Sequence, residues 1–350
     1  MRSRIHILFA AIAVFASSLA CVTIMGEDIP ESAPVELPES LPPQLPQEEP
    51  VPVEQSSCPV ITEQIVEANS VVYTEETAET MEYYGGRDED TTTYLVTYLV
   101  SGDVIFDPYY EDVAPDLRDE QEDAAAHQQI WQYFTTLIPT DYRVTLSEYS
   151  IMTDGQDNVL AAVAQTYDDP ALWGLEVDIV DSSDYYYLTF TLVHEFAHLL
   201  TLSPAQVPPS EAIFNDPENI DIYMQEVSAC PNYFPGEGCA NEDSYLNAFF
   251  DEFWVDIYDE WNEINLEEDD EAYYEKLDDF YYNYQDQFLT DYSATHPVED
   301  IAEAFSFFVF SEKPAGDTIA EQKILFFYQY PELVQLRADI LLNLCANFPQ

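Results

Sequence analysis

Residues 185–202 place the strongest constraint on how this chain can fold. They read YYYLTFTLVHEFAHLLTL and predict a helix that is apolar nearly all round. Four polar residues at 181–184 are typical of a helix start, and Pro204 with the prolines after it ends the helix. A helix without a polar face has to be buried. The rest of the chain must therefore supply elements that cover it.

The residues before this helix predict a mixed β-sheet backed by one helix. Segments rich in β-branched and aromatic residues are expected to be strands, at 91–100, 143–151, 159–166 and 173–180. Between the first two, residues 116–137 predict a helix with its large apolar residues on one side, which Pro115 opens and Pro139 ends.

The residues after the buried helix predict a mainly helical C-terminal half. Helices are expected at 244–264, 271–288 and 298–310, and one or two more at 318–348. Hydrophobic residues make up 47% of the chain and aromatic residues 14%, which is enough for a substantial core. We therefore expect an α+β fold, with one folded domain over residues 58–350.

The N-terminus predicts export. Arg2 and Arg4 precede an apolar run that is short for a membrane span, and Cys21 follows a small-residue cleavage site, so residues 1–20 are interpreted as a signal peptide. Lipidation of Cys21 would make the chain a cell-surface lipoprotein, and the alternatives are plain secretion or an uncleaved anchor. Residues 21–57 are rich in Pro and Glu and predict an extended tether.

The other four cysteines predict two disulfides, since an even number is typical of exported chains. Cys230 and Cys239 flank a loop that contains Pro and Gly, so a local bridge between them is expected. A bridge between Cys58 and Cys345 would then tie the two ends of the domain together. This is one of three possible pairings. No two of these cysteines have C-x-x-C spacing, so they do not predict a zinc site.

The charge of the chain limits its partners. It has 69 acidic and 9 basic residues, a formal charge of -60 at pH 7. Such a surface repels DNA, RNA and anionic lipid headgroups, so we expect no nucleic-acid partner and membrane contact only through an N-terminal lipid or anchor. Acidic side chains keep a protein soluble, and they also attract a cationic stretch of a peptide. Composition leaves both interpretations open.

The buried helix contains the motif HEFAH. His194 and His198 are one turn apart, so both imidazoles can reach one zinc ion. Glu195 is turned about 100° around the helix axis, off the metal, where it can take a proton from an attacking water and deliver it to a leaving amine. The alternative is a pair of structural core histidines beside an ion-paired glutamate.

Zinc needs a third protein ligand. The longer pattern HExxHxxGxxH fails, because Thr201 and Pro204 occupy its Gly and His positions. Candidates lie on the helix after Pro297, where Glu299, Asp300 and Glu303 interrupt an apolar run, and Glu299 and Glu303 share one face. Acids in the first turn of a helix are also ordinary capping residues, so spacing alone leaves the ligand open. His296 is a rival ligand that lies just outside this helix.

Residues 292–305, YSATHPVEDIAEAF, together with HEFAH resemble a known family. They are similar to the motifs of gluzincins such as the anthrax lethal factor catalytic domain. They look closer to bacterial zinc-binding metallopeptidases, many of them lipoproteins, with the signature Y-x6-E-D-x-A-E-x-F. The resemblance implies a zincin-like fold, with Glu299 as third zinc ligand, Tyr292 stabilising the oxyanion and Glu303 behind a zinc-bound histidine. The helices expected between the motifs, at 244–288, are interpreted as an insertion.

The two motifs together predict a zinc-dependent endopeptidase with one Zn²⁺ per chain, held by His194, His198 and Glu299. We expect the strand at 173–180, directly before the motif helix, to be an edge strand along which a peptide substrate pairs. We also expect a monomer. The alternatives are a cell-surface zinc-binding lipoprotein or scaffold without turnover, and a structural surface protein in which HEFAH is accidental.

Overall fold

The computed structural model describes residues 59–70, 92–155, 159–267 and 269–349. The predicted signal peptide at 1–20, the tether at 21–57 with Cys21, and Cys58 all lie outside the described residues. Within the described ranges, no helix is both long enough and apolar enough to cross a membrane.

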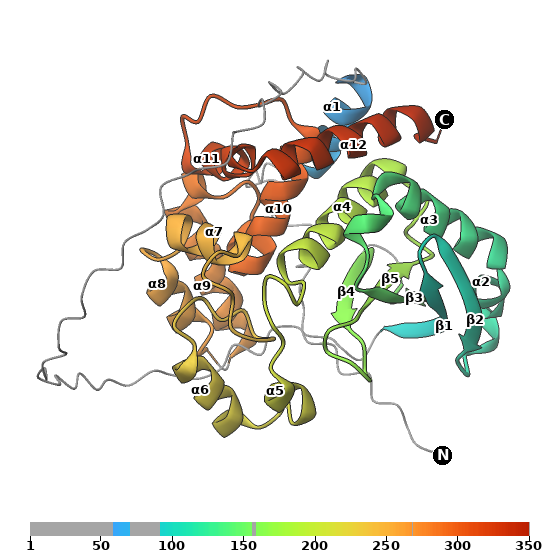
Figure 1. The fold of residues 1–350 in the computed structure, drawn as a ribbon, viewed down its shortest axis with the longest axis horizontal. Helices are drawn as coiled ribbons and strands as arrows, with labels where there is room; N and C mark the ends of the chain where they lie inside the picture. The colour runs from blue at the N-terminus through green and yellow to red at the C-terminus, as the bar shows by residue number, and fades with distance from the viewer. Residues whose placement is uncertain (1–58, 71–91, 156–158, 268, 350) are drawn as a thin grey trace, which may run out of the picture.

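A mixed five-stranded sheet forms one side of the molecule (Figure 1). Its strands are β1 (Thr93–Ser101), β2 (Val104–Tyr110), β3 (Leu146–Thr153), β4 (Ala161–Gln165) and β5 (Trp173–Asp178), in the order β2-β1-β3-β5-β4. β3 and β5 run parallel, and every other neighbouring pair is antiparallel. The four predicted strands and the mixed character of the sheet are confirmed, whereas the sequence did not predict β2.

The prediction that residues 173–180 form an edge strand is wrong. β5 lies inside the sheet between β3 and β4, and its Trp173, Leu175 and Val177 are buried. The edge strand beside the motif helix is β4, a short strand of small residues with the sequence AAVAQ. Strand order depends on pairing between segments far apart in sequence, which a local pattern does not encode.

The backing helix is present, but residues 116–137 do not form one continuous helix. They divide into η1 (Pro115–Leu117), α2 (Arg118–Glu122) and α3 (Ala124–Leu137). Asp123 ends α2 and caps α3, because its side chain accepts a hydrogen bond from the Ala126 N–H at 3.0 Å. α3 packs on the sheet, with the Trp131 ring centroid 5.1 Å from that of Tyr149 in β3.

The motif helix is buried, as predicted. α4 (Tyr185–Thr201) begins after Asp184, whose side chain accepts a hydrogen bond from the Tyr186 N–H at 2.9 Å. Twelve of its 17 residues are buried. Figure 1 shows α4 in the middle of the molecule, between the sheet and the helical half.

α10 packs along α4 and brings the second motif next to the first. It spans Pro297–Phe310, and 13 of its 14 residues are buried, the exception being Glu299. The ring centroids of Phe190 in α4 and Phe307 in α10 are 5.3 Å apart. Because both helices are apolar nearly all round, their few polar side chains meet inside the core.

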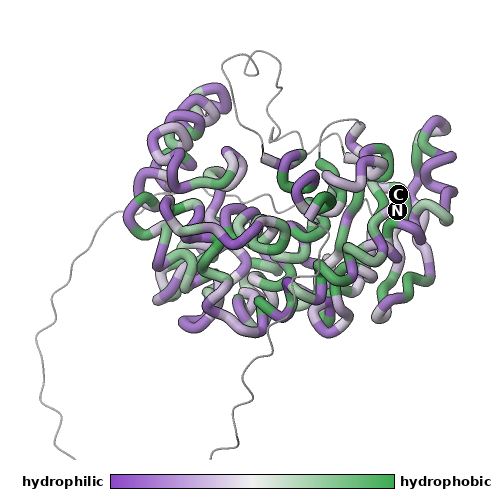
Figure 2. Tube along the Cα trace, turned by 90° about the horizontal axis from the view of Figure 1, so that it is seen from above, coloured by the Kyte–Doolittle hydropathy of each residue, from purple (hydrophilic) through white to green (hydrophobic). Residues whose placement is uncertain are grey.

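Further helices lie before and after these elements within the described residues, so the α+β fold class is confirmed. They are α1 (Pro59–Asn69), α5 (Glu211–Asn215), α6 (Ile220–Ala229), α7 (Tyr245–Phe253), α8 (Tyr258–Ile264), α9 (Asp270–Asn283), α11 (Ile319–Phe326) and α12 (Pro331–Asn347), with the short turns η2 (Thr140–Tyr142), η3 (Gln285–Gln287), η4 (Tyr292–Ala294) and η5 (Phe327–Gln329). The sequence did not predict α1, α5 or α6. Figure 2 shows the apolar segments gathered towards the interior and the polar ones on the outer helices.

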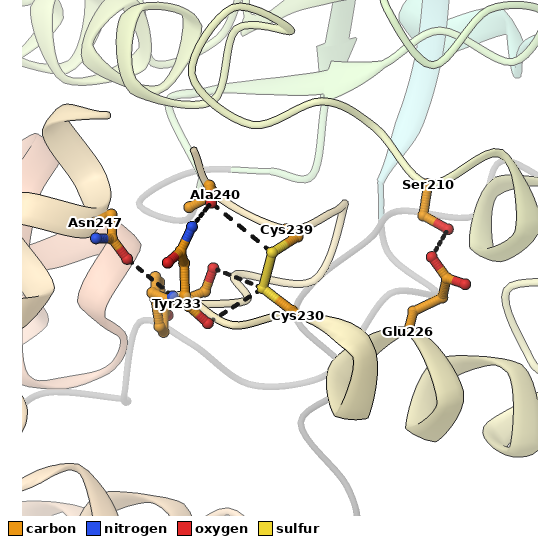
Figure 3. The surroundings of a disulfide bond; sticks show 8 residues. Ser210, Glu226, Cys230, Tyr233, Cys239, Ala240 and Asn247 are labelled. Atoms are coloured by element: carbon orange, nitrogen blue, oxygen red, sulfur yellow. Dashed lines mark hydrogen bonds between the residues drawn. A yellow bond between two sulfur atoms is a disulfide. The ribbon is translucent and has the colours of Figure 1, made fainter. Parts of the chain in front are cut away.

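One predicted disulfide is confirmed. Cys230 and Cys239 are bonded at the end of α6, with their Cα atoms 5.4 Å apart (Figure 3). Cys345 is also disulfide-bonded, and its predicted partner Cys58 lies outside the described residues. Disulfides are typical of oxidising, extracellular environments, which agrees with the predicted export.

Candidate metal centre

Three side chains of α4 lie close enough together to hold a metal ion. The potential ligand atoms of His194, Glu195 and His198 all lie within 4.8 Å of one another, and none of the three residues is more than 7% exposed. The Nε2 atoms of the two imidazoles are 3.1 Å apart. The one-turn spacing therefore brings both histidines to one point, as the motif predicts.

Glu299 of α10 joins this group. Its Oε2 lies 3.0 Å from His194 Nε2 and 3.3 Å from His198 Nε2. A tetrahedral ion with bonds of about 2.0–2.1 Å separates its ligand atoms by about 3.3 Å. The three atoms thus form a triangle of about the size that such an ion requires.

Glu303 orients His194. Its Oε1 lies 3.0 Å from His194 Nδ1, and its Oε2 accepts a hydrogen bond from the Thr290 hydroxyl at 2.8 Å. The carboxylate accepts the proton of Nδ1, so Nε2 of the neutral ring carries a free lone pair. Nδ1 of His198 is enclosed and has no hydrogen-bond partner among the described residues. His194 is therefore the more firmly oriented of the two rings.

A cation can join the ligand atoms that meet here. His194 Nε2 and Glu299 Oε2 are 3.0 Å apart, a contact that either a proton on the imidazole or a bound metal ion satisfies. Burial favours a higher pKa for Glu299, but His198 and His194 hold that pKa well below its usual value, so the carboxylate is ionised. Buried charges are paired or coordinate metals. The group therefore fits a metal ion, and two imidazole nitrogens with one carboxylate oxygen are donors that suit zinc.

Glu195 lies beside the edge strand β4. Leu160 and Thr166, at the two ends of β4, form backbone hydrogen bonds with Asp178 and Leu172 on the β5 side. Because backbone groups of an antiparallel pair alternate in direction, the Val163 N–H points to the free edge of the sheet. That N–H donates a hydrogen bond to the Glu195 carboxylate. Burial raises the pKa of Glu195 to about 7, although the two motif histidines oppose the rise. A carboxyl group with a pKa near neutrality can both accept and release a proton.

Tyr292 stands at the exposed side of the group. It lies in η4, is 43% exposed, and has its ring centroid 5.8 Å from that of His194. Desolvation of its hydroxyl, together with the carboxylates of Glu299 and Glu195, raises the pKa of Tyr292 well above its usual value. The hydroxyl therefore stays protonated and can donate a hydrogen bond.

Two other histidines have structural contacts. His296 Nδ1 accepts a hydrogen bond from the Val298 N–H at 3.1 Å and so caps α10. His127 is buried, with Nδ1 2.9 Å from the Tyr98 hydroxyl and Nε2 2.8 Å from the Glu120 carbonyl oxygen. Neither belongs to the group of possible ligands on α4.

The sequence did not reveal an ion pair that lies behind Glu299. Asp300 Oδ2 is 2.6 Å from Lys323 Nζ and accepts a hydrogen bond from Trp254 Nε1 at 2.8 Å. Asp300 and Lys323 are both 0% exposed. The contacts join α10, α11 and Trp254, which directly follows α7, and they fix α10 at the residue that follows Glu299.

No protein-family profile, curated protein or solved structure matches this chain. The resemblance to bacterial zinc-binding metallopeptidases therefore rests on the two sequence motifs alone, and membership of that family stays a prediction. The same holds for the zincin-like fold, since the structure shows the coarser α+β class with a mixed sheet.

Proposed function

We propose that the chain is a zinc-dependent endopeptidase. The observation that carries the proposal is the meeting of His194 Nε2, His198 Nε2 and Glu299 Oε2 from two distant motifs, at separations of 3.0, 3.1 and 3.3 Å. Two histidines and a glutamate are one of the ligand sets of catalytic zinc sites. The exposed Tyr292 beside them supports a site that is accessible to a substrate.

The residues around the ligands can each assist peptide hydrolysis. Bound zinc would supply a Lewis acid and make water a nucleophile at neutral pH. Glu195 takes the proton of the attacking water and passes it to the leaving amine. Tyr292 donates a hydrogen bond to the carbonyl oxygen as negative charge develops there. Glu303 keeps His194 in the tautomer that leaves Nε2 free.

β4 is the proposed docking edge for the substrate. Every second residue of β4 points its N–H and C=O groups away from β5, and apart from the Val163 N–H, which Glu195 accepts, an extended peptide can pair with them. Its side chains are mostly alanine, which leaves room for such a peptide. Because Glu195 accepts a hydrogen bond from Val163 of this strand, a peptide paired with β4 would pass close to the candidate metal centre.

The full chain with zinc is expected to cleave peptides in a mixed library, with the products read by mass spectrometry. A chelator should abolish cleavage, and one equivalent of zinc should restore it, because the ion supplies the Lewis acid. Cleavage that persists in the chelator would contradict the proposal. A chain that binds zinc and cleaves none of the peptides would favour the alternative, a zinc-binding lipoprotein or scaffold without turnover.

A further inference from the structure

The loop between Cys230 and Cys239 is closed at both ends. The disulfide joins its two ends, and the Ala240 N–H donates a hydrogen bond to the Tyr233 carbonyl at 3.0 Å. Figure 3 shows the disulfide between the end of α6 and the segment that leads into α7. The loop is therefore held as one unit, and the side chains that it carries have defined positions.

Glu237 is fixed within this loop by its own backbone. Its carbonyl accepts a hydrogen bond from the Ser210 N–H at 2.7 Å, and the next residue, Gly238, forms a β-bridge with Pro209. A Cβ atom on Gly238 would lie 2.0 Å from the Pro208 carbonyl oxygen, so this close approach requires glycine. The segment that follows α4 thus anchors the backbone of Glu237.

The Glu237 carboxylate lacks a full set of partners. Its Oε2 is enclosed and has no hydrogen-bond partner in the part of the chain that the structure describes. Buried carboxylate oxygens without partners are unfavourable, and in native structures each calls for an explanation. Burial raises the pKa of Glu237, and the charges of His198 and Glu299 also act on it. The carboxylate therefore lies within electrostatic reach of the candidate metal ligands.

No basic side chain of the described chain is seen to neutralise Glu237. Five of the six described Lys and Arg residues, all but Arg118 of α2, have contacts elsewhere: Arg143 with Asp103, Lys276 with Glu267, Lys323 with Asp300, Lys313 over the Tyr328 ring, and Arg337 with backbone carbonyls. The charge of Glu237 contributes to raising the pKa of Tyr223 and of Tyr233. A carboxylate oxygen without a partner is a suitable acceptor for an ammonium or guanidinium group from outside.

We propose that Glu237 is a specificity-determining residue that binds a positively charged group of the peptide held at the metal centre. The group is an ammonium or guanidinium, either on a Lys or Arg side chain or at a free amino terminus. The inference rests on the proposed function, because it makes Glu237 part of the substrate-binding surface. It adds a preference for cationic peptides, which the overall charge of -60 would reinforce at long range.

The test measures peptide binding to the full chain carrying Glu195→Gln. This substitution removes the proposed proton acceptor, so the peptides stay intact during the measurement. One peptide scaffold carries Lys, Leu or Glu at each position in turn, with a free or an acetylated amino terminus. Glu237→Gln and, as a matched control, Glu242→Gln on the exposed surface are added to the same background. Calorimetry gives the Kd of each peptide for each protein variant, and zinc content is measured for each variant. Cleavage is followed in parallel in chains that keep Glu195.

The expected result is that one Lys position or the free amino terminus tightens binding by about 10- to 100-fold. Glu237→Gln should remove this advantage, and Glu242→Gln should keep it. Acetylation that removes the advantage identifies the amino terminus, and a dependence on Lys position identifies a side chain. Equal binding of Lys and Leu peptides, or an advantage that survives Glu237→Gln, would overturn the inference. Loss of zinc in Glu237→Gln would overturn it too, by making Glu237 a metal ligand.

The same experiment separates this inference from the proposed function. Charge-dependent binding through Glu237 without any cleavage would leave the cation site standing and remove the peptidase proposal. Cleavage without any preference for charge would support the peptidase and remove the role of Glu237.

Discussion

Replacing Glu195 by glutamine is expected to lower kcat for peptide cleavage by about 10²- to 10⁴-fold, with zinc content unchanged. Glutamine keeps the size of the side chain and can still accept the hydrogen bond from Val163, but it cannot take a proton. Zinc should remain bound because His194, His198 and Glu299 supply the proposed ligands. Steady-state kinetics on a cleaved peptide and zinc analysis of the same sample measure both effects.

A glutamate far from the site provides the control for this prediction. Glu211→Gln makes the same change at the exposed start of α5 and should leave kcat and zinc content as in the wild type. A Glu195→Gln variant that binds zinc and keeps more than a tenth of the wild-type kcat would show that another group accepts the proton. A variant that loses zinc would show that Glu195 is itself a ligand.

Replacing Lys323 by methionine is expected to reduce the free energy of unfolding by about 3–5 kcal/mol. The substitution leaves the Asp300 carboxylate in the core without its cation, at a place where both residues are 0% exposed. It also removes the contact of Nζ with the Phe288 ring, 4.2 Å from the ring centroid. The midpoint and slope of a urea unfolding curve measure the loss.

Two further variants distinguish a lost ion pair from a general packing defect. Lys313→Met, at an exposed position, should change the free energy of unfolding by less than about 1 kcal/mol. Adding Asp300→Asn to Lys323→Met should recover part of the loss, because the unpaired buried charge is then absent. A loss below about 1 kcal/mol in Lys323→Met alone would show that the pair does not stabilise the fold.

The elements that carry the two motifs could be predicted because their signals are local. The apolar run of α4 follows the cap Asp184, and the apolar run of α10 follows Pro297, so each helix shows its start and its burial in its own residues. β2 gave no such signal, since all its residues except Ile105 are exposed and it contains Pro108. The position of β5 inside the sheet was missed because strand order is set by contacts that no single segment contains.

The site shows the same division between local and long-range information. The spacing of His194 and His198 is a property of one helix turn, so sequence alone predicts that both can reach one ion. Their meeting with Glu299 depends on how α10 packs along α4; helix spacing offered Glu299 only as one of several candidates, and the family resemblance singled it out. Lys323 and Glu237 gave no signal in a chain with so many charges, because their importance comes from burial and from partners on other elements.

The most direct test of the central claim is the zinc content of the purified full chain and of its Glu299→Ala variant, with Glu312→Ala on the exposed surface as control. We predict about one zinc per chain in the wild type and in Glu312→Ala. In Glu299→Ala the affinity should fall by more than the roughly 10- to 100-fold typical of losing an outer hydrogen-bond partner of a ligand. A well-folded wild type without zinc, or full zinc affinity in Glu299→Ala, would contradict a metal centre formed by His194, His198 and Glu299.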